Sequence, residues 1–449
     1  MKWAQTLERP SASILEGHDF ADHLVNAGAL ANRNYVGVFD PRHRSIVGME
    51  QDVRMTSSPS LDVESVRDDT PACRTQAYLD GAGAALSPTV VTDAVIKHLR
   101  REQEVGGYVA QFEAEDRING ALASVGRMVG VKGSAIALQT SATAAWIRGF
   151  QSIPLEAGDR LLITTAEYAS NVLPMLQQVR RRGVVVEVIP DGPDGTASPH
   201  ALADMLDDTV KVVAITHAPS QNGLLVDAEG IGQVLRNANS QAWYLLDACQ
   251  STGQIPIDMT TIGCDFLAAT GRKWIRGPRG TGFLALSDRA LAELEPVPPD
   301  MYGSTWHGAL EYSSNRDASR FQSFEMSYAG VLGLGAACDY ALNIGLQPIR
   351  ERINSLALHL RNELAEIQGV RVLDRGTQQS GIVVFACPGS DPVAKAWDLQ
   401  RSGITLTGVT AATNPAEHQG YAAQCVLRAS PHIYNTEDDL HRLVTALRN

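Results

Sequence analysis

The sequence lacks features that would each place it in a large class of proteins. No apolar run approaches the ~20 residues that a membrane-spanning helix needs, and the N-terminal residues contain no apolar core of a secretory signal. Positive charge is in deficit, with 38 lysines and arginines against 50 aspartates and glutamates. The net charge of −12 argues against a surface for nucleic acid or an anionic membrane. The 449 residues, 44% of them hydrophobic, indicate a folded protein of two or three domains.

Cysteine is both scarce and scattered. The chain has six cysteines and no CxxC pair, which excludes the common spacing of a zinc site or a disulfide framework. We therefore expect no metal site, and the free thiols favour a reducing cytoplasm. The cysteines are Cys73, Cys249, Cys264, Cys338, Cys387 and Cys425.

Lysine is scarce as well, because only six of the basic residues are lysines. Five of them fall on expected helix surfaces, turns, strand edges or the N-terminus, where they would be solvated. Lys273 differs, since it follows an apolar strand and lies beside Arg272, Arg276 and Arg279. Cationic neighbours would lower the pKa of its amine and leave it free to form a Schiff base. A basic loop that holds a phosphate or is simply solvated is the alternative.

The pattern along the chain divides it into three parts. Residues 1–74 are expected to form an N-terminal extension, with a weakly helical stretch near residues 20–30. In residues 75–334, seven apolar strands alternate with helical segments, which indicates an α/β fold with a mostly parallel sheet covered on both faces. Residues 335–449 are expected to form a smaller α+β domain. The ten expected strands lie at 135–139, 159–165, 184–190, 210–218, 242–248, 264–271, 280–286, 370–374, 381–388 and 423–431.

Asp247 ends one of the most apolar strands, one strand and one helical excursion before Lys273. Both residues would then lie at strand ends and face one crevice of the sheet. A carboxylate and a lysine that face one ring match the needs of pyridoxal 5'-phosphate, because the carboxylate keeps the ring nitrogen protonated and the lysine holds the aldehyde. A helix N-cap is the alternative role for Asp247.

Two further strings suit the same cofactor. Thr140–Thr143 follow a strand and precede a helix, so that hydroxyls, backbone amides and the helix field would favour an anion. An ordinary Ser/Thr cap is the alternative. Tyr168 follows another strand, where its ring would stack on a flat cofactor.

Together, the strings TSAT, EYASN, LLDACQS, TGRKW-RGPRGTG and LRASPH resemble the class V aminotransferase group of fold-type I pyridoxal phosphate enzymes, over roughly residues 75–449. That group includes cysteine desulfurases, kynureninases, isopenicillin N epimerase-like proteins and C–S lyases. The resemblance implies a large domain with a seven-stranded sheet, a small C-terminal domain and a cytoplasmic homodimer with a shared active site.

The resemblance also implies a role for each matched position. Lys273 would carry the cofactor and move protons, and Asp247 would pair with the ring nitrogen. Arg428 would grip the substrate carboxylate, a task that suits its forked guanidinium; a surface arginine is the alternative. The other implied cofactor contacts are Ser141, Ala142, Thr143, Tyr168, Ser220, Gln250, Thr270 and Gln322, and the other implied substrate contacts are Gly107, Tyr108, Asn171 and His217.

The chain departs from the family pattern at several positions. Ser220 stands where the family often has Asn, and Arg272 stands where desulfurases have His. Desulfurases also need a nucleophilic cysteine on a mobile loop shortly before the carboxylate arginine. Between Cys387 and Cys425 this chain has no cysteine, and both thiols are expected to be packed inside strands. Persulfide chemistry is therefore disfavoured.

Two segments are similar to narrower groups of relatives. REQEVGGYVAQFEAE and LRASPHIYNTEDDL are similar to the C–S lyases of the ergothioneine pathway and of thiosugar antibiotic pathways. This similarity would put Gly107 and Tyr108 near the active site, with buried packing as the alternative for Tyr108. DASRFQSFEMSYAG resembles a segment that crosses to the neighbouring subunit, so that Arg320, Gln322 and, more weakly, Arg316 would reach its phosphate. An ordinary turn is the alternative.

The sequence thus predicts an enzyme that acts on an amino acid, a cysteine with a bulky S-substituent, in thiol or secondary metabolism such as antibiotic biosynthesis. β-Elimination would release a thiol, pyruvate and ammonia. Decarboxylation-coupled oxidative deamination to an aldehyde, transamination and epimerisation are the alternatives, since they would use the same cofactor residues. A binding protein that keeps the fold without the cofactor is a fourth alternative.

Overall fold

The computed structural model describes residues 61–389, 391–410 and 425–448. The chain divides into two units, residues 1–57 and 58–449, and all described residues belong to the second unit. The expected helix near residues 20–30 and most of the expected N-terminal extension lie outside the described residues.

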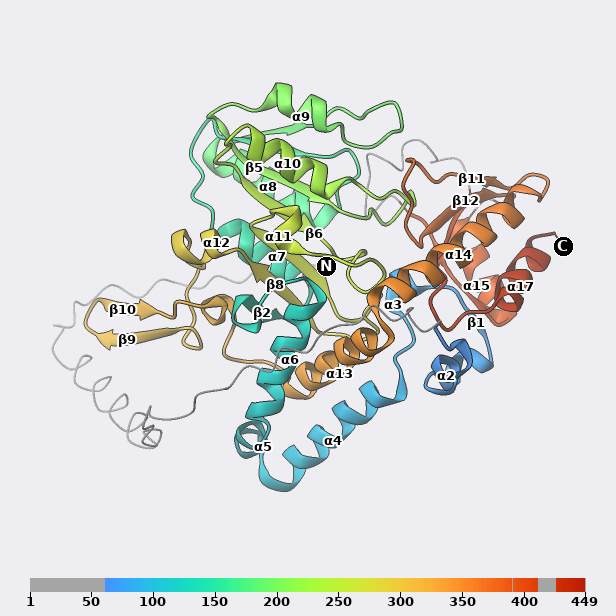
Figure 1. Ribbon diagram of the computed structural model, residues 1–449, viewed down its shortest axis with the longest axis horizontal. Coiled ribbons are helices and arrows are strands. Elements are labelled where there is room, and N and C mark those ends of the chain that lie inside the picture. Colours follow the sequence, from blue (N-terminus) through green and yellow to red (C-terminus); the bar gives the residue numbers. More distant parts are fainter. Residues whose placement is uncertain (1–60, 390, 411–424, 449) are drawn as a thin grey trace, which may run out of the picture. The chain divides into compact units, whose positions relative to one another are not determined.

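A seven-stranded sheet with the order β2-β8-β7-β6-β5-β3-β4 forms the centre of the fold (Figure 1). Neighbouring strands from β4 to β7 pair in parallel, whereas β8 is antiparallel to both of its neighbours. The expected mostly parallel sheet is therefore confirmed. Its strands are β2 (Ile136–Gln139), β3 (Arg160–Ile163), β4 (Val185–Val188), β5 (Val210–Thr216), β6 (Trp243–Asp247), β7 (Phe266–Thr270) and β8 (Gly282–Leu286).

The central strands are apolar because both faces of the sheet are buried. Successive side chains of a strand point to opposite faces, and here they enter two different apolar clusters. Leu246 and Leu267 belong to one cluster, whereas Leu245 and Ala268 belong to the other. Polar residues are found where three of these strands end, at Thr216, Asp247 and Thr270.

Helices cover both faces and flank the sheet. The amphipathic helix α7 packs on β7 and β8, and the apolar helix α13 packs on α4 and α6. The helices of this region are α3 (Gly81–Ala84), α4 (Thr89–Val105), α5 (Gly107–Glu113), α6 (Glu115–Met128), α7 (Ala142–Gln151), α8 (Ala169–Arg182), α9 (Pro199–Met205), α10 (Ala228–Asn237), α11 (Met259–Ile262), α12 (Asp288–Glu293) and α13 (Tyr328–Ile344). Short 3₁₀ turns lie at Gly133–Ala135 and Ala318–Phe321, and an antiparallel hairpin joins β9 (Ser304–Gly308) to β10 (Glu311–Ser314).

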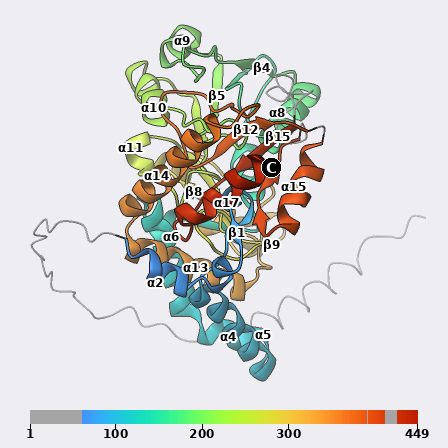
Figure 2. The same cartoon turned by 90° about the vertical axis from the view of Figure 1, so that its right-hand side faces the viewer.

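A second sheet, with the order β11-β12-β15-β14, is antiparallel. Figure 2 shows α14, α15 and α17 gathered around its strands. A separate parallel pair joins β1 to β13, so the chain before the central sheet packs with the C-terminal part. The elements are β1 (Ala77–Tyr78), α14 (Leu346–Ala365), β11 (Arg371–Val372), β12 (Val383–Cys387), α15 (Pro392–Arg401), β13 (Ile404–Thr405), β14 (Thr407–Gly408), β15 (Cys425–Ala429) and α17 (Glu437–Arg448).

The three expected strands of the C-terminal part correspond to β11, β12 and β15. The expected boundary between residues 334 and 335 falls inside α13, so the division into a large and a small domain stays a proposal. Among the described residues, no single helix is long and apolar enough to cross a membrane; α13 and α14 pass that test only as a pair bent by 82°.

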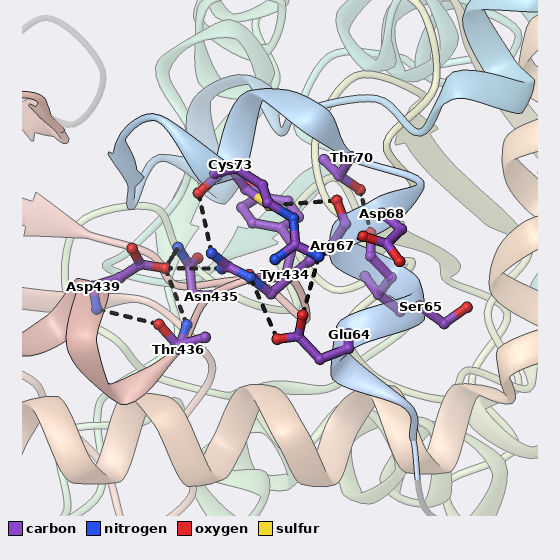
Figure 3. A network of polar contacts seen from close by, with 12 residues as sticks. Glu64, Ser65, Arg67, Asp68, Thr70, Cys73, Tyr434, Asn435, Thr436 and Asp439 are labelled. Carbon is purple, nitrogen blue, oxygen red and sulfur yellow. Dashed lines mark hydrogen bonds and ion pairs between the residues drawn. The ribbon is translucent and has the colours of Figure 1, made fainter.

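The first described segment is tied to the C-terminal part by a polar network (Figure 3). It comprises α2 (Val63–Asp68) and a 3₁₀ turn at Pro71–Arg74. Arg67 Nη1 donates to the carbonyl of Tyr434 at 2.7 Å and lies 3.5 Å from Asp439 Oδ2. The same carboxylate accepts from Asn435 Nδ2 and from the backbone N–H of Thr436. This network fixes the chain just before it enters β1.

Candidate active site

A cavity of about 240 Å³ lies at the carboxyl ends of the central strands. Thr216, Asp247 and Thr270 are the last residues of β5, β6 and β7, and all three line it. This is the edge where open parallel sheets bind their ligands. The predicted site residues that line it are Ser141, Ala142, Thr143, Tyr168, Asn171, Ser220, Asp247, Gln250, Thr270 and Lys273.

Lys273 lies in the turn after β7 and is only 8% exposed. Burial lowers the pKa of its amine, and the positive charges of Arg272 and Arg428 lower it further. The sequence predicts the cationic effect from Arg272, but Arg276 does not contribute to it. The guanidinium of Arg276 instead donates to Leu86 O and Thr70 Oγ1 and lies over the ring of Tyr434.

The turn that carries Lys273 is held by an aromatic stack. Trp274 stacks on His432, which stacks on Tyr434. The ring of His432 also hydrogen-bonds through Nε2 to the carbonyl of Trp274 at 3.1 Å. Burial lowers the pKa of His432 to about 3, so the ring is neutral at physiological pH. The lysine is thus presented by a rigid turn rather than by a solvated loop.

Asp247 is buried, and each of its carboxylate oxygens has a partner. Asn171 Nδ2 donates to Oδ2 at 2.8 Å, and the backbone N–H of Cys249 donates to Oδ1 at 2.9 Å. Burial raises the pKa of Asp247, while these two hydrogen bonds and the charge of Lys273 lower it. Asn171 lines the cavity as well as donating to Asp247, and its predicted substrate contact stays a prediction.

Sequence reasoning missed a second buried carboxyl group, that of Glu167. It lines the cavity and accepts hydrogen bonds from Thr164 Oγ1, Thr216 N and Thr216 Oγ1, at 2.8, 2.8 and 2.7 Å. Burial raises its pKa to about 7, and the negative charge of Asp247 adds to the shift. The one available signal is an acidic residue directly before Tyr168, after an apolar strand.

Sequence reasoning also missed Cys249, whose side chain lines the cavity close to Lys273. Burial raises the pKa of this thiol, so it is protonated at neutral pH. The signal was its place two residues after Asp247, which fixes it at the end of β6.

The opposite end of the cavity is built from the first turn of α7. Ser141 is the N-cap, and its Oγ accepts from the backbone N–H of Ala144 at 3.1 Å. The expected cap is therefore present, and the residues of this turn also line the cavity. The expected anion site stays a prediction. Thr270 Oγ1 donates to the carbonyl of Thr281. Tyr168 is at the N-cap position of α8, without a hydrogen bond from its side chain to the helix, and lines the cavity.

Arg428 lies on β15, close to the cavity but not in its wall. It is 8% exposed, so the alternative of a solvated surface arginine is wrong. Its Nη2 donates to Asp80 Oδ1 at 3.1 Å and to Thr407 Oγ1 at 3.2 Å, and its Nη1 donates to the carbonyl of Ser220 at 3.3 Å. Nε is buried without a hydrogen-bond partner, which leaves a donor for an anion.

Gln250 and His217 have partners inside the protein. Gln250 Nε2 donates to the carbonyl of Ala82, and its Oε1 accepts from Trp274 Nε1. His217 does not line the cavity; its Nδ1 bonds to Ser251 Oγ at 3.0 Å, and burial lowers its pKa to about 4. The structure therefore gives His217 a hydrogen-bond partner inside the protein, and its predicted substrate contact stays a prediction.

Three predicted residues lie away from the cavity of their own chain. Gln322 is buried, and its Oε1 accepts from the N–H of Leu138 on the edge strand β2. Gly107 and Tyr108 lie on α5, where Tyr108 is 70% exposed rather than packed. Arg320 is also turned inward and donates to the carbonyls of Leu291 and Leu294. Their roles toward a neighbouring subunit stay predictions.

The residues of the cavity fit pyridoxal phosphate. Lys273 provides a buried amine for an aldehyde, and Asp247 provides an oriented, buried carboxylate for a protonated ring nitrogen. Ser141, Thr143 and the first turn of α7 provide donors for a phosphate. The arrangement thus offers one partner for each polar end of the cofactor and an aromatic wall, Tyr168, for its ring.

Comparisons with known proteins agree with this arrangement. The sequence model of the family described as "Aminotransferase class-V" matches residues 77–443. A probable cysteine desulfurase of Methanothermobacter thermautotrophicus is 30% identical over 388 residues, which cover 85% of this chain and 96% of that protein. A cysteine desulfurase of Salmonella agona is 26% identical, over 86% and 97% of the two chains.

Solved structures have the same fold. The apo structure of a cysteine desulfurase from Thermococcus onnurineus superposes with a TM-score of 0.78, at 22% identity, over 88% of this chain and 98% of that one. A cystine C–S lyase in complex with cysteine persulfide superposes with a TM-score of 0.75, at 21% identity, over 85% and 99%.

Proposed function

The chain belongs to the class V aminotransferase family, and on this premise we propose that it is a pyridoxal phosphate-dependent C–S lyase. It would cleave the Cβ–S bond of a cysteine that carries an S-substituent. The conjugate and one water molecule would give a free thiol, pyruvate and ammonia. The observation that carries the proposal is the pairing of buried Lys273 and buried Asp247 in one cavity, with Arg428 beside it.

The cofactor would be held by the residues that fit it. Lys273 would bind the aldehyde, Asp247 the ring nitrogen, and Ser141, Thr143 and the first turn of α7 the phosphate. When bound, pyridoxal phosphate supplies an electron sink that stabilises negative charge at the Cα of an amino acid. Asn171 would keep Asp247 oriented toward the ring nitrogen.

The protein side chains would perform the binding and the proton transfers. Arg428 would hold the substrate carboxylate, with its unpartnered Nε as the additional donor. Lys273 Nζ would take the proton from Cα and give one to the departing sulfur. The lowered pKa of Lys273 supports this role, because a base is effective when it is not held protonated.

The cysteines support release of a free thiol over persulfide transfer. No cysteine lies between residues 388 and 424, the segment that precedes the Arg428 strand. Cys387 and Cys425 are buried on β12 and β15. Cys249 is in the cavity, but burial keeps its thiol protonated, and its backbone is tied to Asp247. A cysteine desulfurase would need a mobile thiolate beside the substrate, whereas Cys387 and Cys425 lie on strands outside the active-site cavity.

The broader setting belongs to the same proposal. We place the enzyme in the cytoplasm, as a homodimer that shares its active sites, in thiol or secondary metabolism such as antibiotic biosynthesis. Exposed apolar side chains on α4 and α5, those of Leu99, Tyr108 and Phe112, support burial of this face by a second copy. Tyr108 and Gln322 would then act toward the neighbouring site.

The test is mass spectrometry of the products formed from the holoenzyme and S-benzylcysteine. The proposal predicts equimolar benzyl thiol and pyruvate. An S-linked aldehyde with carbon dioxide, or conversion of the cofactor to its amine form with a keto acid still carrying sulfur, would contradict it. The exposed Lys132→Ala variant is the matched control for Lys273→Ala, and only the latter variant should form no product.

A further inference from the structure

Two thiols lie side by side in the antiparallel sheet of the C-terminal part. Cys387 ends β12 and Cys425 begins β15, and the two residues are direct partners in the strand register. Their Sγ atoms are 3.7 Å apart, and both are free thiols. The other four cysteines lie on other elements, so this pair is distinct from them.

The backbone geometry of this pair permits a disulfide. Directly opposed residues of an antiparallel pair have Cα atoms about 4.5 to 5.5 Å apart. A disulfide needs a Cα separation of about 4.4 to 6.8 Å and an S–S distance of about 2.05 Å. Closing the bond between Cys387 and Cys425 therefore requires side-chain rotation and no movement of the strands.

Both cysteines line a cavity of about 450 Å³, where Cys387 is 7% exposed and Cys425 is 1% exposed. Gly389 is part of its wall; a Cβ at this position would lie 3.5 Å from Cys425 Sγ, and the glycine leaves that side of the sulfur open. Arg371 also lines the cavity, and the positive charge of Lys395 acts on both thiols. Cations at the entrance favour an anionic reagent.

We infer that Cys387 and Cys425 form a thiol–disulfide exchange site for anionic, low-molecular-weight disulfides. The thiolate of one cysteine attacks a disulfide RSSR, forms a mixed disulfide and releases one thiolate. The second cysteine loses its proton, attacks the mixed disulfide and releases the second thiolate. The protein loses two protons and two electrons, and RSSR is reduced to two RSH. This site is separate from the proposed lyase chemistry and does not depend on it.

The burial of the pair sets the rate of the exchange. Burial raises the pKa of Cys387 to about 12, and burial also raises the pKa of Cys425. Only a small fraction of each thiol is in the thiolate form at neutral pH, so exchange is slow at that pH. Below the thiol pKa, the rate increases about tenfold for each pH unit.

The experiment treats the full-length holoenzyme with glutathione disulfide across a range of pH, traps free thiols with an alkylating agent and maps the peptides by mass spectrometry. We expect a cross-linked peptide pair that contains Cys387 and Cys425, with two glutathione molecules released per bond and a rate that increases with pH. Free thiols at both positions after prolonged exposure at high pH, or glutathione adducts without the cross-link, would overturn the inference.

Matched variants separate the pair from the other thiols. Cys338→Ser removes a buried cysteine of α13 and should leave the cross-link unchanged, whereas Cys387→Ser and Cys425→Ser should abolish it. An uncharged disulfide, hydroxyethyl disulfide, should react severalfold more slowly than glutathione disulfide. Equal rates for the two reagents would overturn the role of the cationic entrance.

Discussion

The two halves of the candidate site are built in different ways. The cofactor half consists of residues at the ends of neighbouring strands and in the turns that follow them, such as Asp247, Lys273 and Glu167. The carboxylate half consists of Arg428 and its partners Asp80, Thr407 and Ser220, which come from separate parts of the chain. The first half follows from the topology of one sheet, and the second needs long-range packing between two sheets. Substitutions in the two halves should therefore affect different kinetic constants.

Replacement of Lys273 has the largest expected effect and tests the cofactor half. Lys273→Ala removes the group that we propose to bind the cofactor and to move the proton. Turnover should decrease by at least ~10³-fold, with the melting temperature nearly unchanged. The measurement is kcat for pyruvate release, beside a thermal melt of the same sample. Turnover within tenfold of the wild-type value would contradict the assignment.

Replacement of Arg428 tests the carboxylate half and should act mainly on KM. Arg428→Lys keeps the charge but loses the fork that reaches Asp80, Thr407 and a substrate carboxylate at once. KM should increase about 10- to 100-fold, with a smaller change in kcat. Arg127→Lys, at an exposed ion pair, is the matched control. An unchanged KM in the Arg428 variant would separate this residue from the substrate.

Replacement of Asp80 also tests the carboxylate half. It should decrease KM, by a smaller factor than Arg428→Lys increases it. Asp80 shares Nη2 of Arg428 at 3.1 Å, so it competes with the substrate carboxylate for the guanidinium. Asp80→Asn weakens this competitor, and KM should decrease about fivefold, equivalent to ~1 kcal/mol. The KM for an S-substituted cysteamine, which has no carboxylate, should not decrease in this variant. An increase in KM would instead mean that Asp80 orients Arg428.

Replacement of Glu167 should affect stability more than turnover. Its pKa in the fold is about 7, above the ~4.3 of an unperturbed glutamate. The folded state therefore holds this proton more tightly, and the free energy of unfolding decreases by up to ~3 kcal/mol as pH rises from about 4 to about 7. Glu167→Gln keeps an oxygen that can accept from Thr216 but has no titrating carboxyl group. This pH-dependent decrease in the free energy of unfolding should therefore be absent in the variant.

Urea unfolding across that pH window measures the effect. The exposed Glu325→Gln variant is the control and should keep the wild-type pH dependence. If the free energy of unfolding of the Glu167 variant decreases with pH as steeply as that of the wild type, other groups cause the pH dependence.

The sequence predicts the cofactor half well because strand-end residues of a parallel sheet meet by topology. Lys273 and Asp247 were placed together on that rule alone. The partner of Asp247 is not predictable in the same way, because Asn171 reaches it from α8, 76 residues earlier in the chain, and the two residues are adjacent only in the fold. Glu167 and Cys249 lie inside the strings EYASN and LLDACQS, but sequence reasoning gives the roles in these strings to their neighbours Tyr168, Asp247 and Gln250.

The carboxylate half is less predictable from sequence. The apolar context of Arg428 indicates burial, but the sequence gives no sign of Asp80, which lies 348 residues earlier. Gly107, Tyr108 and Gln322 do not meet the cavity within one chain, so their roles depend on contacts that the sequence and a single chain do not contain. Residues near one strand end can be inferred from local patterns; residues joined by tertiary or subunit contacts cannot.

The most direct test of the account asks which amine holds the cofactor. Borohydride reduction of the holoenzyme fixes a pyridoxyl group on that amine, and peptide mapping by mass spectrometry then identifies the lysine among the six in the chain. The account predicts the label on Lys273 alone. A label on another lysine, or no label in protein that binds the cofactor, would contradict the assignment of Lys273 and of the cavity around it as the active site.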